Sequence, residues 1–97
     1  MSLRDALQLK NKTVTIDGME VVLRRPSIAD LVEAIEISGN PKIHFVSWTV
    51  LNHLLEGNKP MFSSLDEVMV CDFHLVEKIG KEIDILYAEG RDLPAQS

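Results

Sequence analysis

Apolar and polar positions alternate between residues 13 and 25, which is the pattern of a β-sheet with one buried face. Asp17-Gly18 interrupts the alternation and favours a two-residue hairpin turn, because both central positions of that turn adopt positive φ. The turn predicts three cross-strand pairs, which are Ile16 with Met19, Val14 with Val21, and Lys12 with Leu23. Two strands alone are marginally stable in water, so we expect this hairpin to pack on the helices that follow, on a partner, or on both.

The segment from Ser27 to Ser38 has the pattern of an amphipathic helix. Ser27 and Asp30 match a capping box, in which each side chain bonds a backbone N–H of the other residue. Apolar residues then recur at the spacing of one helix face, at Ile28, Leu31, Val32 and Ile35. The pattern predicts a helix that begins directly after Pro26 and has one apolar side.

Three more helices are predicted further along the chain. Asn40-Pro41 is typical of an N-cap and first helical position, so we expect a helix from Pro41 to Glu56 with Gly57 as its C-cap. Ser63 to Glu67 offers a second capping box, which opens a short helix to about Val70. The last helix is expected from Cys71 to Ala88, with Gly80 near its apolar face to allow close helix contact.

These elements together predict an α+β fold that is mostly helical, with an N-terminal β-hairpin followed by about four helices. A chain of 97 residues has room for a single domain. Within it we expect a flexible arm at 1–12, the hairpin at 13–25, the helical body at 27–88 and a frayed tail at 89–97.

Charge narrows the class of partner. Residues 1–25 hold five Lys/Arg against three Asp/Glu, whereas residues 26–97 hold five against twelve. Affinity for nucleic acid depends mainly on neutralising phosphates, so we expect no nucleic-acid partner for such an acidic body. The longest apolar run is far too short to span a membrane, and no signal-peptide pattern follows Met1. The single cysteine, Cys71, fits a reducing compartment, so we expect a cytoplasmic protein without membrane association.

Residue types that carry out chemistry are present but scattered. Cys71 and His74 lie one helical turn apart, yet a zinc site needs about four ligands and no second cysteine or histidine pair supplies them. The carboxylates are spaced along the predicted helices as solvated charge, and no glycine-rich phosphate-binding loop occurs. We therefore expect no catalytic residues, no metal, no cofactor and no enzymatic activity.

The predicted helix from Pro41 to Glu56 has two apolar stripes. One stripe comprises Ile43, Val46, Val50 and Leu54, and the other comprises Phe45, Trp48 and Leu55. A helix that is apolar on two sides is either central in its domain or docks another molecule. At least one residue of the second stripe should then reach the surface or an oligomer contact. Both interpretations remain open, and we take Phe45, Trp48 and Leu55 as candidate partner-binding residues, since Trp is enriched at binding hot spots.

Arg24 and Arg25 end the hairpin and are further candidates for partner binding. Charge at a strand end also discourages edge pairing between molecules. Alternatively, these arginines pair with acidic groups such as Asp30, one turn into the first helix of the body.

DNA binding is the alternative function that the sequence suggests. The helix at Ser27–Ser38, the turn at Gly39 and the helix at Pro41–Glu56 resemble a helix-turn-helix, as found in phage and prophage regulators. The second helix would have to face phosphates and bases, but Lys42 is its only basic residue. We therefore keep this interpretation as the second choice.

The order of features resembles the small tail assembly chaperones of Mu-like and other long-tailed bacteriophages. In these proteins a strand, a Gly turn, a second strand ending in an Arg-x-Pro element and a helical body recur, and a Leu-Asp segment precedes the last helix. The matching positions, spread over about residues 13 to 88, are Gly18, Val21, Leu23, Arg24 or Arg25, Pro26, Asp30, Leu31, Leu65 and Asp72.

The resemblance implies a non-enzymatic role in virion assembly. Such chaperones bind the long helical tape-measure protein and help to assemble tail-tube subunits around it in the cytoplasm of the infected bacterium. Many of these families also make a longer product by ribosomal frameshifting. The resemblance thus implies tape-measure and tail-tube proteins as partners, and it carries over no catalytic residues.

Overall fold

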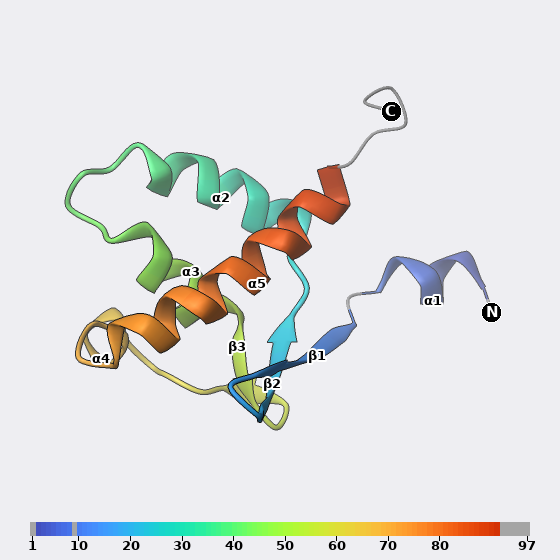
Figure 1. The fold of residues 1–97 in the computed structure, drawn as a ribbon. Helices are drawn as coiled ribbons and strands as arrows, with labels where there is room; N and C mark the ends of the chain where they lie inside the picture. Colours follow the sequence, from blue (N-terminus) through green and yellow to red (C-terminus); the bar gives the residue numbers. More distant parts are fainter. Residues whose placement is uncertain (1, 9, 92–97) are drawn as a thin grey trace.

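The fold belongs to the α+β class, as predicted (Figure 1). A computed structural model describes residues 2–8 and 10–91. Its elements are α1 (Leu3–Leu7), β1 (Asn11–Ile16), β2 (Met19–Arg24), α2 (Ile28–Ser38), α3 (Phe45–His53), β3 (Leu54–Glu56), β4 (Lys59–Pro60), α4 (Leu65–Met69) and α5 (Phe73–Arg91). The predicted order is inexact, because α1 precedes the hairpin and the sheet has four strands.

The two chain ends differ from the predicted arm and tail. Ser2 caps α1 by accepting a hydrogen bond from the N–H of Asp5 at 3.2 Å, so part of the expected arm is helical. Strand β1 begins at Asn11, two residues earlier than predicted. Helix α5 continues through Glu89 to Arg91, and the rest of the expected tail, residues 92–97, lies outside the described residues.

The hairpin has the register that its turn predicts. Asp17 and Gly18 have φ of 51° and 79°, as a type I′ turn requires. The three predicted pairs form, joining Ile16 to Met19, Val14 to Val21, and Lys12 to Leu23. Because the register is correct, Ile16 and Leu23 lie on the same face and both are buried in the core.

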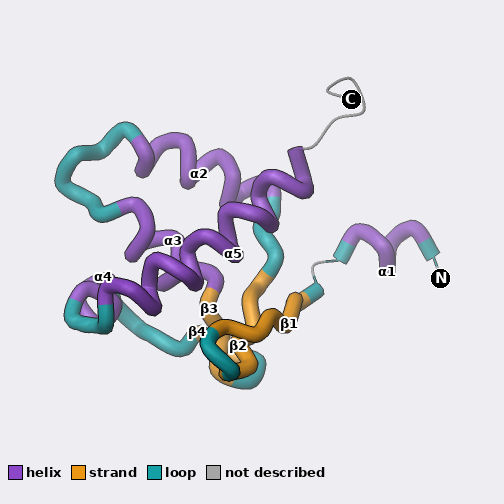
Figure 2. The backbone as a smooth tube through the Cα atoms, viewed as in Figure 1, coloured by secondary structure: helices purple, strands orange, loops and turns teal. Residues whose placement is uncertain are grey.

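The prediction of helix through Leu54, Leu55 and Glu56 is wrong. Helix α3 ends at His53, and β3 pairs antiparallel with β2 through Leu54 and Leu55, which completes a sheet of order β1-β2-β3-β4 (Figure 2). Gly57, expected as a helix C-cap, instead begins the two-residue turn to β4 with φ of 66°. The open edge of β2 gives these backbone groups sheet partners, which outweighs their local helix preference.

The predicted helix start at Asn40-Pro41 is also wrong. The side-chain oxygen of Asn40 accepts from the N–H of Lys42 at 3.0 Å, and its carbonyl accepts from Ile43 at 3.2 Å. These bonds form a turn, in which an Asn side chain competes with helix formation. Helix α3 therefore begins at Phe45, with His44 as its N-cap.

The last two helices are close to their predicted positions. The second capping box does not form: Ser64 is the N-cap of α4 without a side-chain bond, while the Ser63 hydroxyl donates to Glu67. Asp72 accepts from the N–H of Leu75 at 3.0 Å, which starts α5 at Phe73 rather than Cys71. None of the helices within the described residues combines the length and apolar character that crossing a membrane requires.

Helix α5 runs across the molecule in front of α3 and contacts both α3 and β1 (Figure 1). Its buried apolar row, which shares one core with the hairpin, α3 and β3, comprises Val76, Ile79, Ile83 and Leu86. Gly80 permits the close approach, since a Cβ there would lie 2.7 Å from Cγ1 of Val46 on α3. The predicted role of Gly80 is confirmed.

Candidate protein-docking surface

Arg24 connects the hairpin to two helices. Its guanidinium donates to both carboxylate oxygens of Asp30 on α2, at 2.7 and 3.2 Å, and to the carbonyl of Asn52 on α3, at 2.8 and 3.2 Å. Burial alone would raise the pKa of Asp30, but hydrogen bonds from Arg24 and from the Ser27 backbone outweigh it and lower that pKa to about 2. The pairing of Arg24 with Asp30, one of the three interpretations of the arginines given above, is confirmed.

Arg25 has a different environment from Arg24. Its guanidinium lies 3.6 Å from Glu89 near the end of α5, and Lys12 of β1 donates to the same carboxylate at 3.1 Å. The hydrogen bond from Lys12 is the main cause that lowers the pKa of Glu89. This cluster is largely exposed, and pairs of that kind contribute little to stability. Arg25 thus remains accessible for a partner, whereas Arg24 is committed within the domain.

A buried histidine extends the Arg24 network to α5. His53 is fully buried, with Nδ1 3.0 Å from the carbonyl of Arg24 and Nε2 2.7 Å from the hydroxyl of Tyr87. A carbonyl only accepts, so Nδ1–H donates to it and Nε2 accepts from the hydroxyl. Burial, followed by the charge of Arg24, lowers the pKa of His53, and burial raises the pKa of Tyr87 to about 12. The only sign of this His53 network in the sequence is a histidine among apolar residues. The pattern of residues alone therefore did not predict the network.

The three apolar candidates on the second stripe lie inward. Trp48 and Leu55 are 7% and 8% exposed, and half-buried Phe45 stacks on Trp48 with ring centroids 5.9 Å apart. Leu55 belongs to β3, so it does not continue the helical stripe. Helix α3 contacts α2, α4, α5, β2 and β4, which places it centrally in the domain. Phe45 alone of the three reaches the surface, and a partner-binding role for the set stays a prediction.

Exposed apolar residues gather instead on α2. Ile28, Val32 and Ile35, here called the α2 stripe, follow the i, i+4, i+7 spacing and are between 54% and 84% exposed. Leu31 flanks the stripe and is half-buried, while Ala34 is the buried residue of the helix. The Arg24–Asp30 pair fixes the other side of α2 toward the body, and this orientation turns the stripe outward.

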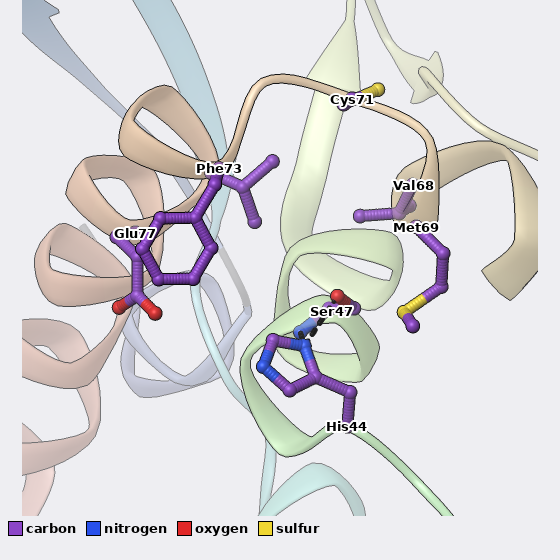
Figure 3. A pocket seen from close by; sticks show the side chains of 8 residues that line it. His44, Ser47, Val68, Met69, Cys71, Phe73 and Glu77 are labelled. Carbon is purple, nitrogen blue, oxygen red and sulfur yellow. Dashed lines mark hydrogen bonds between the residues drawn. The ribbon is translucent and has the colours of Figure 1, made fainter.

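A second exposed apolar surface lies where α4 ends and α5 begins. Met69, Val70 and Phe73, here called the α4–α5 corner, are each more than half exposed. A pocket of about 220 Å³ opens beside them, lined by His44, Ser47, Val68, Met69, Cys71, Phe73, Val76 and Glu77. Figure 3 shows Phe73 and Glu77 on one wall, Val68 and Met69 on the opposite wall, and His44 with Ser47 below.

The polar groups of His44, Ser47 and Cys71 in this pocket are already engaged in local structure. Nδ1 of His44 accepts from the hydroxyl of Ser47 at 2.6 Å and from its N–H at 3.4 Å, which caps α3. The thiol of Cys71 donates to the carbonyl of Glu67 at 3.2 Å. Within residues 2–8 and 10–91, no three His, Cys, Asp or Glu side chains are grouped so that they could hold a metal. The surface accordingly presents apolar contacts with one acid, Glu77, at its edge.

The described residues therefore present two exposed apolar areas, the α2 stripe and the α4–α5 corner, neither of which coincides with the predicted partner-binding residues. Comparison of the chain with protein-family models, with curated proteins and with solved structures gives no match.

Proposed function

We propose that this protein is a non-enzymatic tail assembly chaperone of a long-tailed bacteriophage, which binds a helical segment of the tape-measure protein in the bacterial cytoplasm and assists tail-tube assembly. The observation that carries the proposal is the α2 stripe. An amphipathic helix normally turns its apolar side toward its own core. Here Ile28, Val32 and Ile35 face solvent in one row, which is the arrangement that packs against another amphipathic helix.

The size of the stripe suits a reversible contact. Full burial of each such side chain contributes roughly 1.5–3 kcal/mol of apolar transfer free energy. Association also costs several kcal/mol of translational, rotational and side-chain freedom. Three side chains alone would therefore bind weakly, and a chaperone that must release its client during assembly needs moderate affinity.

The charge around the stripe favours a basic client. Helix α2 carries Asp30, Glu33 and Glu36 and no lysine or arginine, and Asp30 is already paired with Arg24. Glu33 and Glu36 flank the stripe and are exposed. These acids keep the apolar surface soluble, and they attract a helix whose apolar side is bordered by lysine or arginine.

The helix-turn-helix alternative gains no support from the position of α3. A recognition helix must present side chains to the major groove. Helix α3, which would take that role, has Ser47, Trp48, Thr49, Val50 and His53 buried inside the domain. A mobility-shift experiment that showed sub-micromolar, sequence-dependent DNA binding would nevertheless overturn the chaperone proposal.

Calorimetric titration with overlapping peptides from the tape-measure protein of the phage or prophage that encodes this chain tests the proposal. We expect one or more peptides to bind, and the triple substitution Ile28→Gln, Val32→Gln and Ile35→Gln to weaken binding at least about tenfold, the scale of a hot-spot contact. Ile85→Gln is the control, because Ile85 is an exposed isoleucine on α5 that does not belong to the stripe.

Two outcomes would contradict the proposal in different ways. If no tape-measure segment binds, the chaperone function is rejected. If a segment binds equally well to the triple variant, the client contacts another surface. Circular dichroism melts show whether each variant remains folded. Trp48→Ala is expected to unfold the domain rather than weaken binding selectively, because Trp48 is buried.

A further inference from the structure

We propose that the α4–α5 pocket receives one large apolar side chain of a partner polypeptide that carries a lysine or arginine next to that anchor. This adds a second contact to the α2 stripe, and it rests on the proposed function for the identity of the partner. The pocket itself is argued from its size, its walls and its charge.

Pocket size selects a single side chain. The volume of about 220 Å³ exceeds the roughly 150 Å³ of an engineered cavity that holds one benzene molecule. It is smaller than the roughly 300–1,000 Å³ typical of sites for small-molecule ligands and cofactors. A phenylalanine, leucine or methionine side chain therefore fits this pocket better than a complete cofactor does.

The walls suit insertion of an apolar group. Val68 and Val76 line the pocket, are buried and belong to the core, so they form a fixed apolar part of its lining. Met69 and Phe73 stand on opposite walls and are more than half exposed (Figure 3). A flexible methionine beside an aromatic ring is a combination that adapts to different inserted side chains. An anchor placed between them would cover apolar surface on both sides.

The negative charge at the edge of the pocket determines which charge the partner should carry next to its inserted side chain. Glu77 lies on the same wall as Phe73 and is half-buried, and no ion pair joins it to another residue within the described ranges 2–8 and 10–91. Between Lys59 and Lys78 the sequence holds four acids and no lysine or arginine. Lys78 itself turns away to Asp17, at 2.7 Å. The acids are Asp66, Glu67, Asp72 and Glu77.

This charge distribution distinguishes between two kinds of occupant. A cationic group beside the anchor would neutralise Glu77 in a partly desolvated position, where a charge pair is stronger than in open solvent. A second copy of this chain, with a net charge of −5, would bring acidic surfaces together. Charge complementarity therefore favours a basic partner polypeptide over self-association.

Amide chemical-shift titration of the full chain with three small probes tests the pocket directly. The probes are 2-phenylethylammonium, 2-phenylethanol and 3-phenylpropionate, which share an aromatic ring and differ in charge. We expect shifts centred on Ser47, Met69, Phe73 and Val76, with the ammonium binding about threefold more tightly than the alcohol, the scale of a partly exposed charge pair. The carboxylate should bind most weakly.

Two substitutions separate the apolar and electrostatic contributions. Phe73→Ala should weaken the binding of all three probes. It should leave the fold intact, because Phe73 is exposed. Glu77→Gln should remove the advantage of the ammonium while leaving the alcohol unchanged. Glu82→Gln is the matched control, since Glu82 is another half-buried acid of α5 that does not line the pocket. Equal affinity of all three probes, or shifts located elsewhere, would overturn the proposal.

The same variants distinguish this inference from the proposed function. If a tape-measure peptide binds and is insensitive to Phe73→Ala and Glu77→Gln, the pocket proposal fails while the chaperone proposal stands. If the probes behave as expected but no tape-measure peptide binds, the chaperone proposal fails and the pocket remains. Sedimentation of the chain should show a monomer, and a dimer that Phe73→Ala dissociates would assign the pocket to a second copy instead.

Discussion

Helix α5 buries its apolar row against α3 and the hairpin, whereas α2 leaves Ile28, Val32 and Ile35 exposed to solvent. Both helices show the same apolar periodicity in the sequence. The difference lies in what positions each helix. Apolar side chains and the close contact at Gly80 hold α5, while hydrogen bonds of Ser27, Asp30 and Arg24 hold the start of α2. Periodicity shows that a helix has an apolar side, but it does not show what covers that side.

The largest expected change in the free energy of unfolding comes from a comparison of two isoleucine substitutions, one on α5 and one on α2. Ile83→Ala on α5 removes a fully buried side chain and should lower the free energy of unfolding by about 2–5 kcal/mol. Ile35→Ala on α2 should change it by less than about 0.5 kcal/mol, because that side chain is already exposed. Urea unfolding followed by circular dichroism measures both. Equal losses would mean that the α2 stripe is covered in solution.

The next effect tests the polar attachment of α2. The pKa of Asp30 is about 2 in the folded chain against an ordinary value of 3.8, so its contribution to stability is present above that value and disappears as pH falls toward 2. Asp30→Asn should cost about 1–2 kcal/mol at neutral pH after allowance for solvent screening. The difference from the wild type should shrink in acid.

Unfolding measured across the acid range checks this prediction. The exposed acid Glu36 on the same helix provides the control, and Glu36→Gln should change the free energy of unfolding at neutral pH by less than about 0.5 kcal/mol. If Asp30→Asn and the wild type differ by a constant amount at every pH, the ion pair with Arg24 does not determine how α2 is held.

A smaller effect concerns the close packing of α5 on α3. Gly80→Ala would bring a methyl group within 2.7 Å of Val46, so the helices must shift at a cost of about 1–3 kcal/mol. The better helix propensity of Ala offsets roughly 1 kcal/mol of that cost. We expect a net loss of about 1 kcal/mol in thermal or urea unfolding. When Gly80→Ala is introduced into the Val46→Ala variant, it should be neutral or stabilising relative to that variant. If the two substitutions have additive effects on the free energy of unfolding, the contact between residues 80 and 46 is excluded.

The smallest effect is a change in how steeply the free energy of unfolding depends on pH, rather than a change in its value at neutral pH. Burial lowers the pKa of His53 below its ordinary 6.5, so the unfolded chain takes up a proton that the folded chain does not. Stability should therefore decline as pH falls below about 6.5. The groups facing His53 are the guanidinium of Arg24, Asp30 and Tyr87, and the pKa values of Asp30 and Tyr87, about 2 and about 12, lie outside that window. His53→Gln should flatten the slope, and an unchanged slope would show that another group titrates.

Local signals predicted those parts of the fold that local chemistry determines. The Asp17-Gly18 turn sets the register of the hairpin, and the Ser27–Asp30 capping box sets the start of α2. Strand β3 was not predictable in this way, because Leu54 and Leu55 find their partners on β2, some thirty residues earlier in the chain. Long-range pairing of this kind leaves no trace in a local apolar pattern.

The candidate docking surface was less predictable than the fold. Trp48 was predicted to bind a partner because of its residue type. It is instead buried in the domain, where it stacks with Phe45. Met69 and Phe73 lie on either side of a break between two helices, where no periodicity marks a common face. The pocket arises from the angle between these helices and the base of α3, which only the assembled structure specifies.

The junction between α3 and β3 limits how the length of this chain can vary. His53 is the last helical residue and Leu54 the first strand residue, with no spacer between them. Successive side chains on a strand point to opposite faces, so one inserted residue there would exchange the sides of Leu54 and Leu55 and displace the buried imidazole. Residues 39–43, between α2 and the N-cap residue of α3, have no strand alternation to preserve. Natural length changes and engineered tags in the interior of this domain should therefore concentrate at 39–43 and avoid the helix-to-strand junction.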